Sequence, residues 1–125
     1  MIKAFPLIAL LMISFSYSQN GPDYSTPEKT YSTYISALRN NDSLAVWRCW
    51  DPEEFRFHTT REFALQPFKI VGTTVFDSSE VTFRGYGSIG DVELRVERIN
   101  GKYKYIELVF LEKVNNKWKI TTIVD

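Results

Sequence analysis

The single imidazole of the sequence, His58, is the first side chain whose type could do chemistry. Carboxyl groups lie near it along the chain, at Asp51, Glu53, Glu54 and Glu62. A histidine paired with a carboxylate can abstract a proton next to a carbonyl group, and a tyrosine hydroxyl can stabilise the oxyanion that forms. One histidine among several acids is more often a surface or capping residue. His58 is therefore a catalytic candidate only under an alternative hypothesis, in which the chain is a small pocket enzyme.

Aromatic side chains are the second group with a possible role at a site. At helical spacing such residues more often form the core than line a pocket. If they enclose a pocket, we expect a small apolar ligand there. The candidate ligand-binding residues are Tyr31, Tyr34, Trp50, Phe57, His58 and Tyr105.

The sequence gives little support for a metal or a cofactor. With one cysteine and one histidine in 125 residues, a thiolate-rich or multi-histidine metal site is excluded. The segment from Gly85 to Gly90 fits the G-x-G-x-x-G pattern, but a dinucleotide site needs a helix directly after it. The alternating segment 92–99 predicts a strand instead. We expect no cofactor, and we expect these glycines to form a bent loop.

The charges argue against a nucleic-acid partner. Fifteen basic and fifteen acidic residues give a net charge of zero, and the two signs alternate along the chain. The run Glu93, Arg95, Glu97 and Arg98 is typical of cross-strand pairs on a solvated sheet face.

The amino-terminal segment predicts export. Lys3 precedes an apolar run over residues 4–13, and Ser16 and Ser18 supply small residues before a cleavage site. The run is shorter than the roughly 20 residues of a membrane span, so we expect no span after cleavage. We assign residues 1–18 to a signal peptide, 19–25 to a linker and 26–125 to one domain, located in the periplasm or outside the cell. Cys49 would then be a buried apolar residue or, alternatively, form an intermolecular disulfide.

The first part of the domain is predicted to be helical. Thr26, Pro27 and Glu28 are typical of a helix start, and apolar residues from Tyr31 to Leu38 follow at helical spacing. Residues 40–42 should end this helix and cap a second one, in which Val46, Trp47 and Trp50 share a face. We expect a third, short helix over residues 60–66, although residues 55–58 alternate like a strand.

Strands should form the rest of the domain. We expect them over residues 68–76, 81–85, 92–99, 103–114 and 118–124, with turns at Asn100-Gly101 and Asn115-Asn116. Helices followed by an antiparallel meander indicate an α+β domain. The segment 103–114 is apolar on both faces, which predicts either a homodimer through the outer sheet face or strong twist within a monomer.

Two segments resemble a known family. Residues 26–28, the helix through 34–38, Asn41-Asp42, Ala45 and Trp50 resemble the start of small exported members of the nuclear-transport-factor-2-like (cystatin-like, SnoaL-like) superfamily. Residues 108–120, ending in Lys-Trp-Lys-Ile, are similar to the last hairpin of that group. The resemblance implies a strongly curved, cone-like antiparallel sheet around the helices, with a possible apolar pocket. It also implies a dimer through the sheets, as in many members, and often no catalytic set in exported members of unknown function.

We therefore expect an exported, non-enzymatic binding or interaction module. The alternatives are the pocket enzyme that uses His58 with a nearby acid, and a structural dimeric module of the cell envelope.

Overall fold

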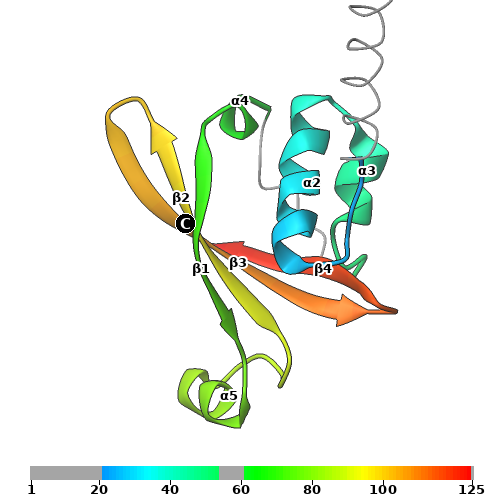
Figure 1. The fold of residues 1–125 in the computed structure, drawn as a ribbon, viewed down its shortest axis with the longest axis vertical. Coiled ribbons are helices and arrows are strands. Elements are labelled where there is room, and N and C mark those ends of the chain that lie inside the picture. Colours follow the sequence, from blue (N-terminus) through cyan, green and yellow to red (C-terminus); the bar gives the residue numbers. More distant parts are fainter. Residues whose placement is uncertain (1–20, 54–60, 125) are drawn as a thin grey trace, which may run out of the picture.

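The computed structural model describes residues 21–53 and 61–124. The predicted signal peptide and the segment 55–58, which includes the candidate residues Phe57 and His58, lie outside this part of the chain. The described elements form an α+β fold in which helices pack on a four-stranded antiparallel sheet (Figure 1). No described helix has the length and hydrophobicity needed to cross a membrane.

Helix α2 (Pro27–Arg39) has the predicted start. The Thr26 side chain accepts a hydrogen bond from the backbone N–H of Lys29, and Pro27 occupies the first helical turn. The predicted apolar stripe is confirmed, because the residues that it comprises are buried against the sheet. These are Tyr31, Tyr34, Ile35 and Leu38.

Helix α3 (Ser43–Arg48) begins at the predicted cap, since the Asp42 carboxylate accepts from the backbone N–H of Ala45. Val46 and Trp50 are buried as expected, but the prediction for Trp47 is wrong, because Trp47 is 46% exposed. Trp47 follows Val46 directly and is therefore rotated from it by about 100° around the helix axis, which places it on the solvent side. The short helix α4 (Arg61–Ala64) lies within the predicted range 60–66.

The sheet is a meander in the order β1-β2-β3-β4, with every neighbouring pair antiparallel. Its strands are β1 (Phe68–Val75), β2 (Val92–Asn100), β3 (Tyr103–Val114) and β4 (Lys117–Val124). Asn115 and Asn116 both adopt positive φ, as a type I′ hairpin turn requires. The β2–β3 turn has Gly101 and Lys102 at its centre, one residue later than the Asn-Gly pair suggested.

Residues 81–85 do not form the predicted strand. Residues 78–84 form a helix, α5 (Ser78–Arg84), which lies at the opposite end of β1 from α4 (Figure 1). The Asp77 side chain caps it by accepting from the backbone N–H of Glu80, and Gly85 ends it in the left-handed conformation at φ 74°. The local capping signals therefore outweighed the alternation of Val81 and Phe83.

The sheet is not strongly curled, so the expected cone is also corrected. Two register irregularities interrupt the pairing, one beside Gly72 and one beside Leu111. With α5 in place of a further strand, the sheet has four strands and few bulges with which to bend. Helices α2 and α3 lie together over one face, which we call the inner face (Figure 1).

The core fills the space between these helices and the inner face. Val92, Leu94 and Val96 on β2 point into it, as predicted. The expectation that Glu93 and Arg98 lie on a solvated face is wrong, since both are buried. Arg98 shares the inner face with the three apolar residues of β2, whereas Glu93 lies on the opposite, outer face beneath α5.

Candidate functional site

The predicted pocket residues that the structure describes are core residues. Tyr31, Tyr34 and Trp50 are at most 2% exposed and pack against one another, with the Tyr34 and Trp50 rings edge to face at 6.0 Å. Tyr105 is half-buried and donates to the Oε1 atom of Gln66 at 3.1 Å. The structure thus brings Tyr31, Tyr34 and Trp50 together, as a packed cluster.

A buried polar network lies beside this cluster, and the sequence analysis did not single it out. The Tyr31 hydroxyl donates to Glu107 Oε1 at 2.7 Å and accepts from Arg98 Nη1 at 3.0 Å. Arg98 also donates to the backbone carbonyl of Phe63, with its guanidinium 4.1 Å from the centre of the Phe63 ring. Three secondary-structure elements, α2, β2 and β3, therefore meet through polar side chains.

The network has a structural role, because the Tyr31 hydroxyl on α2 is hydrogen-bonded to both Arg98 on β2 and Glu107 on β3. Arg98 is fully buried and Glu107 is 2% exposed. Burial raises the pKa of Tyr31, and the neighbouring Glu107 carboxylate raises it further. Tyr31 therefore stays protonated at all physiological pH values and cannot act as a base there.

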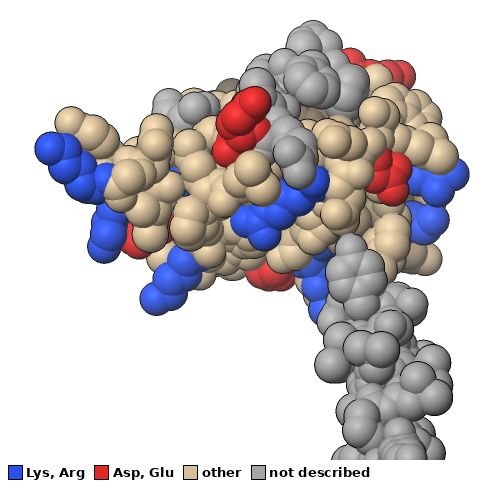
Figure 2. Space-filling view, turned by 90° about the horizontal axis from the view of Figure 1, so that it is seen from above, with Lys and Arg blue, Asp and Glu red and all other residues tan. Residues whose placement is uncertain are grey.

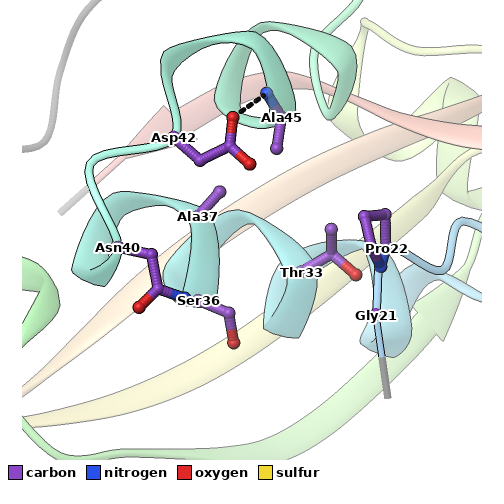
Figure 3. A pocket seen from close by; sticks show the side chains of 8 residues that line it. All are labelled: Gly21, Pro22, Thr33, Ser36, Ala37, Asn40, Asp42 and Ala45. Atoms are coloured by element: carbon purple, nitrogen blue, oxygen red, sulfur yellow. Dashed lines mark hydrogen bonds between the residues drawn. The ribbon is translucent and has the colours of Figure 1, made fainter. Parts of the chain in front are cut away.

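A small cavity of about 230 Å³ lies between α2 and α3 (Figure 3). Two of its polar side chains already have partners: Thr33 bonds with the backbone of Asp23 through its hydroxyl, and Asp42 caps α3. The cavity therefore offers few polar contacts to a ligand.

A larger groove of about 720 Å³ lies near the α5 end of the sheet. We call it the outer groove. Its aromatic residues are Phe76, Tyr86 and Phe110, whose rings meet edge to face with centroids 5.8 to 6.5 Å apart. Tyr86 is 52% exposed, so part of this apolar cluster faces solvent. Such a cluster can bind an aromatic or aliphatic group by contact.

The charged side chains that line the outer groove are all acidic among the described residues. The carboxyl groups come from Asp51 and Glu53 after α3, Asp91 before β2 and Glu112 on β3. No Lys, Arg or His is among the described lining residues. A hydrogen bond between the Glu112 and Asp51 side chains lowers the pKa of Asp51, so Asp51 carries a negative charge at neutral pH. The groove therefore has a negative wall beside an aromatic surface.

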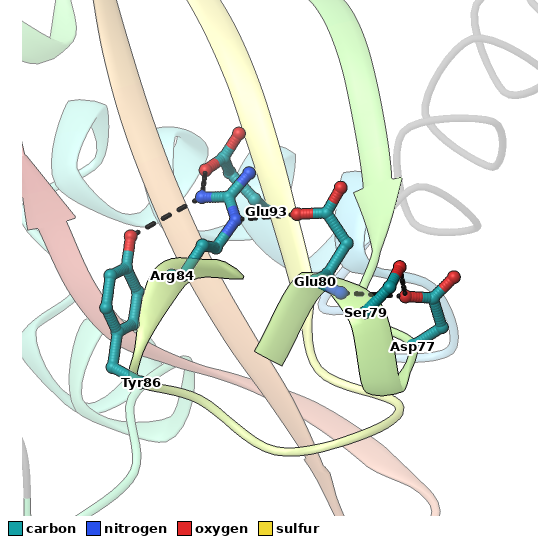
Figure 4. A network of polar contacts seen from close by, with 6 residues as sticks. All are labelled: Asp77, Ser79, Glu80, Arg84, Tyr86 and Glu93. Atoms are coloured by element: carbon teal, nitrogen blue, oxygen red, sulfur yellow. Dashed lines mark hydrogen bonds and ion pairs between the residues drawn. The ribbon is translucent and has the colours of Figure 1, made fainter. Parts of the chain in front are cut away.

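Arg84 fixes the α5 segment beside the outer groove (Figure 4). Its Nε donates to Glu80 at 2.9 Å, and its Nη1 donates to the buried Glu93 carboxylate and to the Tyr86 hydroxyl at 3.4 Å. The guanidinium also lies 4.7 Å from the centre of the Phe76 ring. This one side chain thus ties α5 to β2 and to two aromatic residues of the groove.

Gly87 lets the loop after α5 lie directly on Phe76. A Cβ atom at position 87 would be 2.7 Å from Cε2 of that ring, and the backbone there has φ 85°. The G-x-G-x-x-G pattern thus lies in a loop, and strand β2 follows it where a dinucleotide site would need a helix.

One face of the molecule carries charges of both signs. On the face seen in Figure 2, Lys and Arg side chains alternate with Asp and Glu across a largely uncharged surface. Among the described residues, no group of three or more His, Cys, Asp and Glu side chains could hold a metal ion.

Comparison with known proteins gives no relative: no family model, no curated protein and no solved structure matches the chain.

The sequence analysis missed the outer groove because its lining comes from four separate parts of the chain. One part of this lining had a local signal. The run Asp-Ser-Ser-Glu at residues 77–80 is typical of a helix start, and the loop after that helix carries Tyr86 and Gly87 of the groove.

Proposed function

We propose that this chain is an exported, non-enzymatic binding module whose ligand site is the outer groove. The observation that carries the proposal is the groove of about 720 Å³ with three aromatic rings in edge-to-face contact. Ligand sites in proteins commonly have this size and combine apolar surface with a few polar groups.

The packing of the inner face supports this choice. Leu94, Val96 and Val109 are fully buried beneath the helices, and the Tyr31 hydroxyl and both Nη atoms of Arg98 are bonded within the protein. A ligand between the helices and the sheet would have to displace these contacts. The outer groove needs no such rearrangement.

The charge of the lining selects the class of ligand. A positively charged group beside Glu53 and the Asp51–Glu112 pair would gain electrostatic attraction, and an apolar body would contact Tyr86 and Phe110. The proposed ligand therefore joins an ammonium or guanidinium group to an aromatic or aliphatic portion. An anion of the same shape would be repelled.

Membership of the nuclear-transport-factor-2-like superfamily is also part of the proposal. Three helices followed by antiparallel strands are compatible with the nuclear-transport-factor-2-like resemblance, although the four-stranded sheet is shallower than the cone that it implies. Export through cleavage after residue 18 likewise stays a prediction.

The test compares two probes of the same shape and opposite charge, 2-phenylethylammonium and 3-phenylpropionate, by NMR titration of the full chain. We expect saturable shifts at Tyr86, Phe110 and Glu53 with the ammonium compound only. Tyr86→Ala should weaken its binding by about threefold to tenfold. Glu53→Gln should weaken it by about threefold.

Matched variants control for general effects on the surface. Tyr103→Ala removes another exposed tyrosine, and Glu62→Gln neutralises another exposed acid, both away from the groove. Neither should change the affinity. Equal shifts at the groove residues with the two probes, or no shift there with the ammonium compound, would contradict the proposal.

A further inference from the structure

A second charged cluster lies where α3 ends and β4 begins, apart from the lining of the outer groove. Its basic residues are Lys117 and Lys119, which lie against the ring of Tyr24, and Arg48, which is near enough to lower the pKa of the Tyr24 hydroxyl. We call this group the basic cluster. The proposed function does not use it.

Backbone contacts fix the position of the cluster. Strand β4 donates from the backbone N–H of Trp118 to the carbonyl of Tyr24 at 2.9 Å, and Ile120 and Cys49 are joined in the same way at 2.7 Å. Because residues 24 and 49 are held along the same edge of β4, Tyr24 and the end of α3 must lie beside Lys117 and Lys119. The arrangement therefore follows from the fold and does not depend on long, mobile side chains alone.

Two of the three cations, Lys117 and Lys119, share one aromatic ring. The Nζ atoms of Lys119 and Lys117 lie 4.6 and 6.0 Å from the centre of the Tyr24 ring. Lys119 also donates to the backbone carbonyl of Arg48. The Arg48 guanidinium is close enough to lower the pKa of the Tyr24 hydroxyl, although burial of that hydroxyl raises the pKa more.

The positive charges are not balanced by ion pairs. None of the three forms a salt bridge with another described residue. The acids that face the cluster have other partners, since Asp42 caps α3 and Glu112 bonds with Asp51. Burial lowers the pKa of Lys119, and repulsion from Lys117 and Arg48 lowers it further. Like charges at this spacing destabilise the free protein, and a bound anion would relieve the repulsion.

We propose that the basic cluster binds an oxyanion, namely a carboxylate, sulfate or phosphate, either as a free ion or as a group of a larger ligand. The Lys117 and Lys119 ammonium groups would donate charge-assisted hydrogen bonds to its oxygens, and Arg48 would offer a planar pair of donors. Both ammonium groups lie within 6.0 Å of the centre of the Tyr24 ring, so one ligand group at this ring is within reach of both.

The experiment titrates the full chain with inorganic phosphate and, separately, with trigalacturonate, a short sugar chain that carries carboxylates. Backbone NMR shifts at residues 24, 48, 117 and 119 are the readout. We expect saturable binding of both probes. Tighter binding of trigalacturonate would assign the oxyanion to a polymer, and tighter binding of phosphate would assign it to a free ion; either result supports the site.

Variants separate the site from general electrostatic attraction. Lys117→Gln and Lys119→Gln should each weaken binding by about tenfold. Lys102→Gln is the matched control, because Lys102 also lies over a tyrosine ring, at 5.9 Å, but on the β2–β3 turn. Lys117 is exposed and carries no described hydrogen bond, so its variant tests the site even if Lys119→Gln destabilises the fold.

Two results would overturn the inference. The first is a loss of affinity in Lys102→Gln as large as in Lys117→Gln, which would show unspecific attraction to a positive surface. The second is a shift that grows linearly with probe concentration in the unmodified chain. Neither result bears on the outer groove, whose proposed ligand is an organic cation.

Discussion

At the scale of single residues, Arg98 shows what an alternating pattern can and cannot predict. The alternation of β2 correctly predicted that Val92, Leu94 and Val96 are buried. Arg98 occupies the next position of the same face, so the alternation of β2 alone predicts that it is buried, whereas its charge suggested that it is exposed. The partners that make this burial tolerable, Tyr31 and Glu107, lie 67 and 9 positions away in the sequence. Such long-range pairing cannot be read from a local pattern.

Cys49 provides a residue-scale prediction about stability at high pH. Its thiol is fully buried and donates to the carbonyl of Ala45, and burial raises the pKa of the thiol to about 12. In the unfolded chain the thiol ionises near pH 8.5. Above that pH the unfolded state loses a proton that the folded state keeps, so the free energy of unfolding falls as pH rises. Between pH 9 and pH 10 this one group should reduce it by about 1 kcal/mol.

Urea denaturation at several pH values measures this effect, with Cys49→Ala as the comparison. The variant should lose stability overall because of the space that the sulfur leaves, but its decline between pH 9 and pH 10 should be shallower than that of the unmodified chain. Parallel curves for the two proteins would contradict the buried, protonated thiol.

At the scale of elements, the sequence predicted most helices and strands and misread one. The start of α2, the full extent of β3 and the Asn115-Asn116 turn are confirmed because each depends on local signals: a cap, an alternation and two residues that tolerate positive φ. Helix α5 was misread because two alternating apolar residues were given more weight than the cap at Asp77. None of its residues is fully buried, so tertiary packing does not impose its structure.

The Arg84–Glu93 contact gives a prediction about this element. The Glu93 side chain is 5% exposed and bonds to Arg84, so Arg84→Gln leaves a carboxylate buried without its cation. The variant should be less stable by about 2 to 3 kcal/mol in chemical denaturation. Amide hydrogen exchange in α5 should rise with it.

The double variant Arg84→Gln, Glu93→Gln is the matched control. Since two neutral amide groups can bond to each other, it should recover part of the stability that the single variant loses. A single variant as stable as the unmodified chain would show that Arg84 does not hold α5.

At the scale of the whole molecule, the sequence predicted the two layers but neither the shape of the sheet nor the outer groove. The layers follow from one apolar stripe on a helix and one buried face on a strand, which are both local patterns. The groove joins the ends of α3 and β1 to the middle of β3 and β4, and its lining depends on how far the sheet bends. Bulges bend a sheet, and of the two irregularities the one beside Gly72 had a local signal, an isolated glycine within a strand, whereas the one beside Leu111 had none.

Self-association through the outer sheet face remains a prediction at this scale. Ile106 lies on that face, is 41% exposed and does not line the groove. If two copies pair there, Ile106→Lys places a charge in the interface and should weaken the dimer more than about tenfold, as measured by sedimentation equilibrium. Tyr103→Lys, which alters the opposite face of the same strand, should leave the association constant unchanged. A monomer at all concentrations of the unmodified chain would exclude this dimer.

The two borders of the sheet differ. The backbone of β4 bonds along its outer side to Tyr24, Cys49 and Asp51, whereas β1 is ladder-bonded to β2 on one side and is the terminal strand of the described sheet. A strand from a second molecule would therefore extend the sheet more readily at β1 than at β4. If two molecules pair antiparallel through their β1 strands, the free edge of each β1 becomes hydrogen-bonded to the other. Association would then stop at a dimer and would not continue into a fibre.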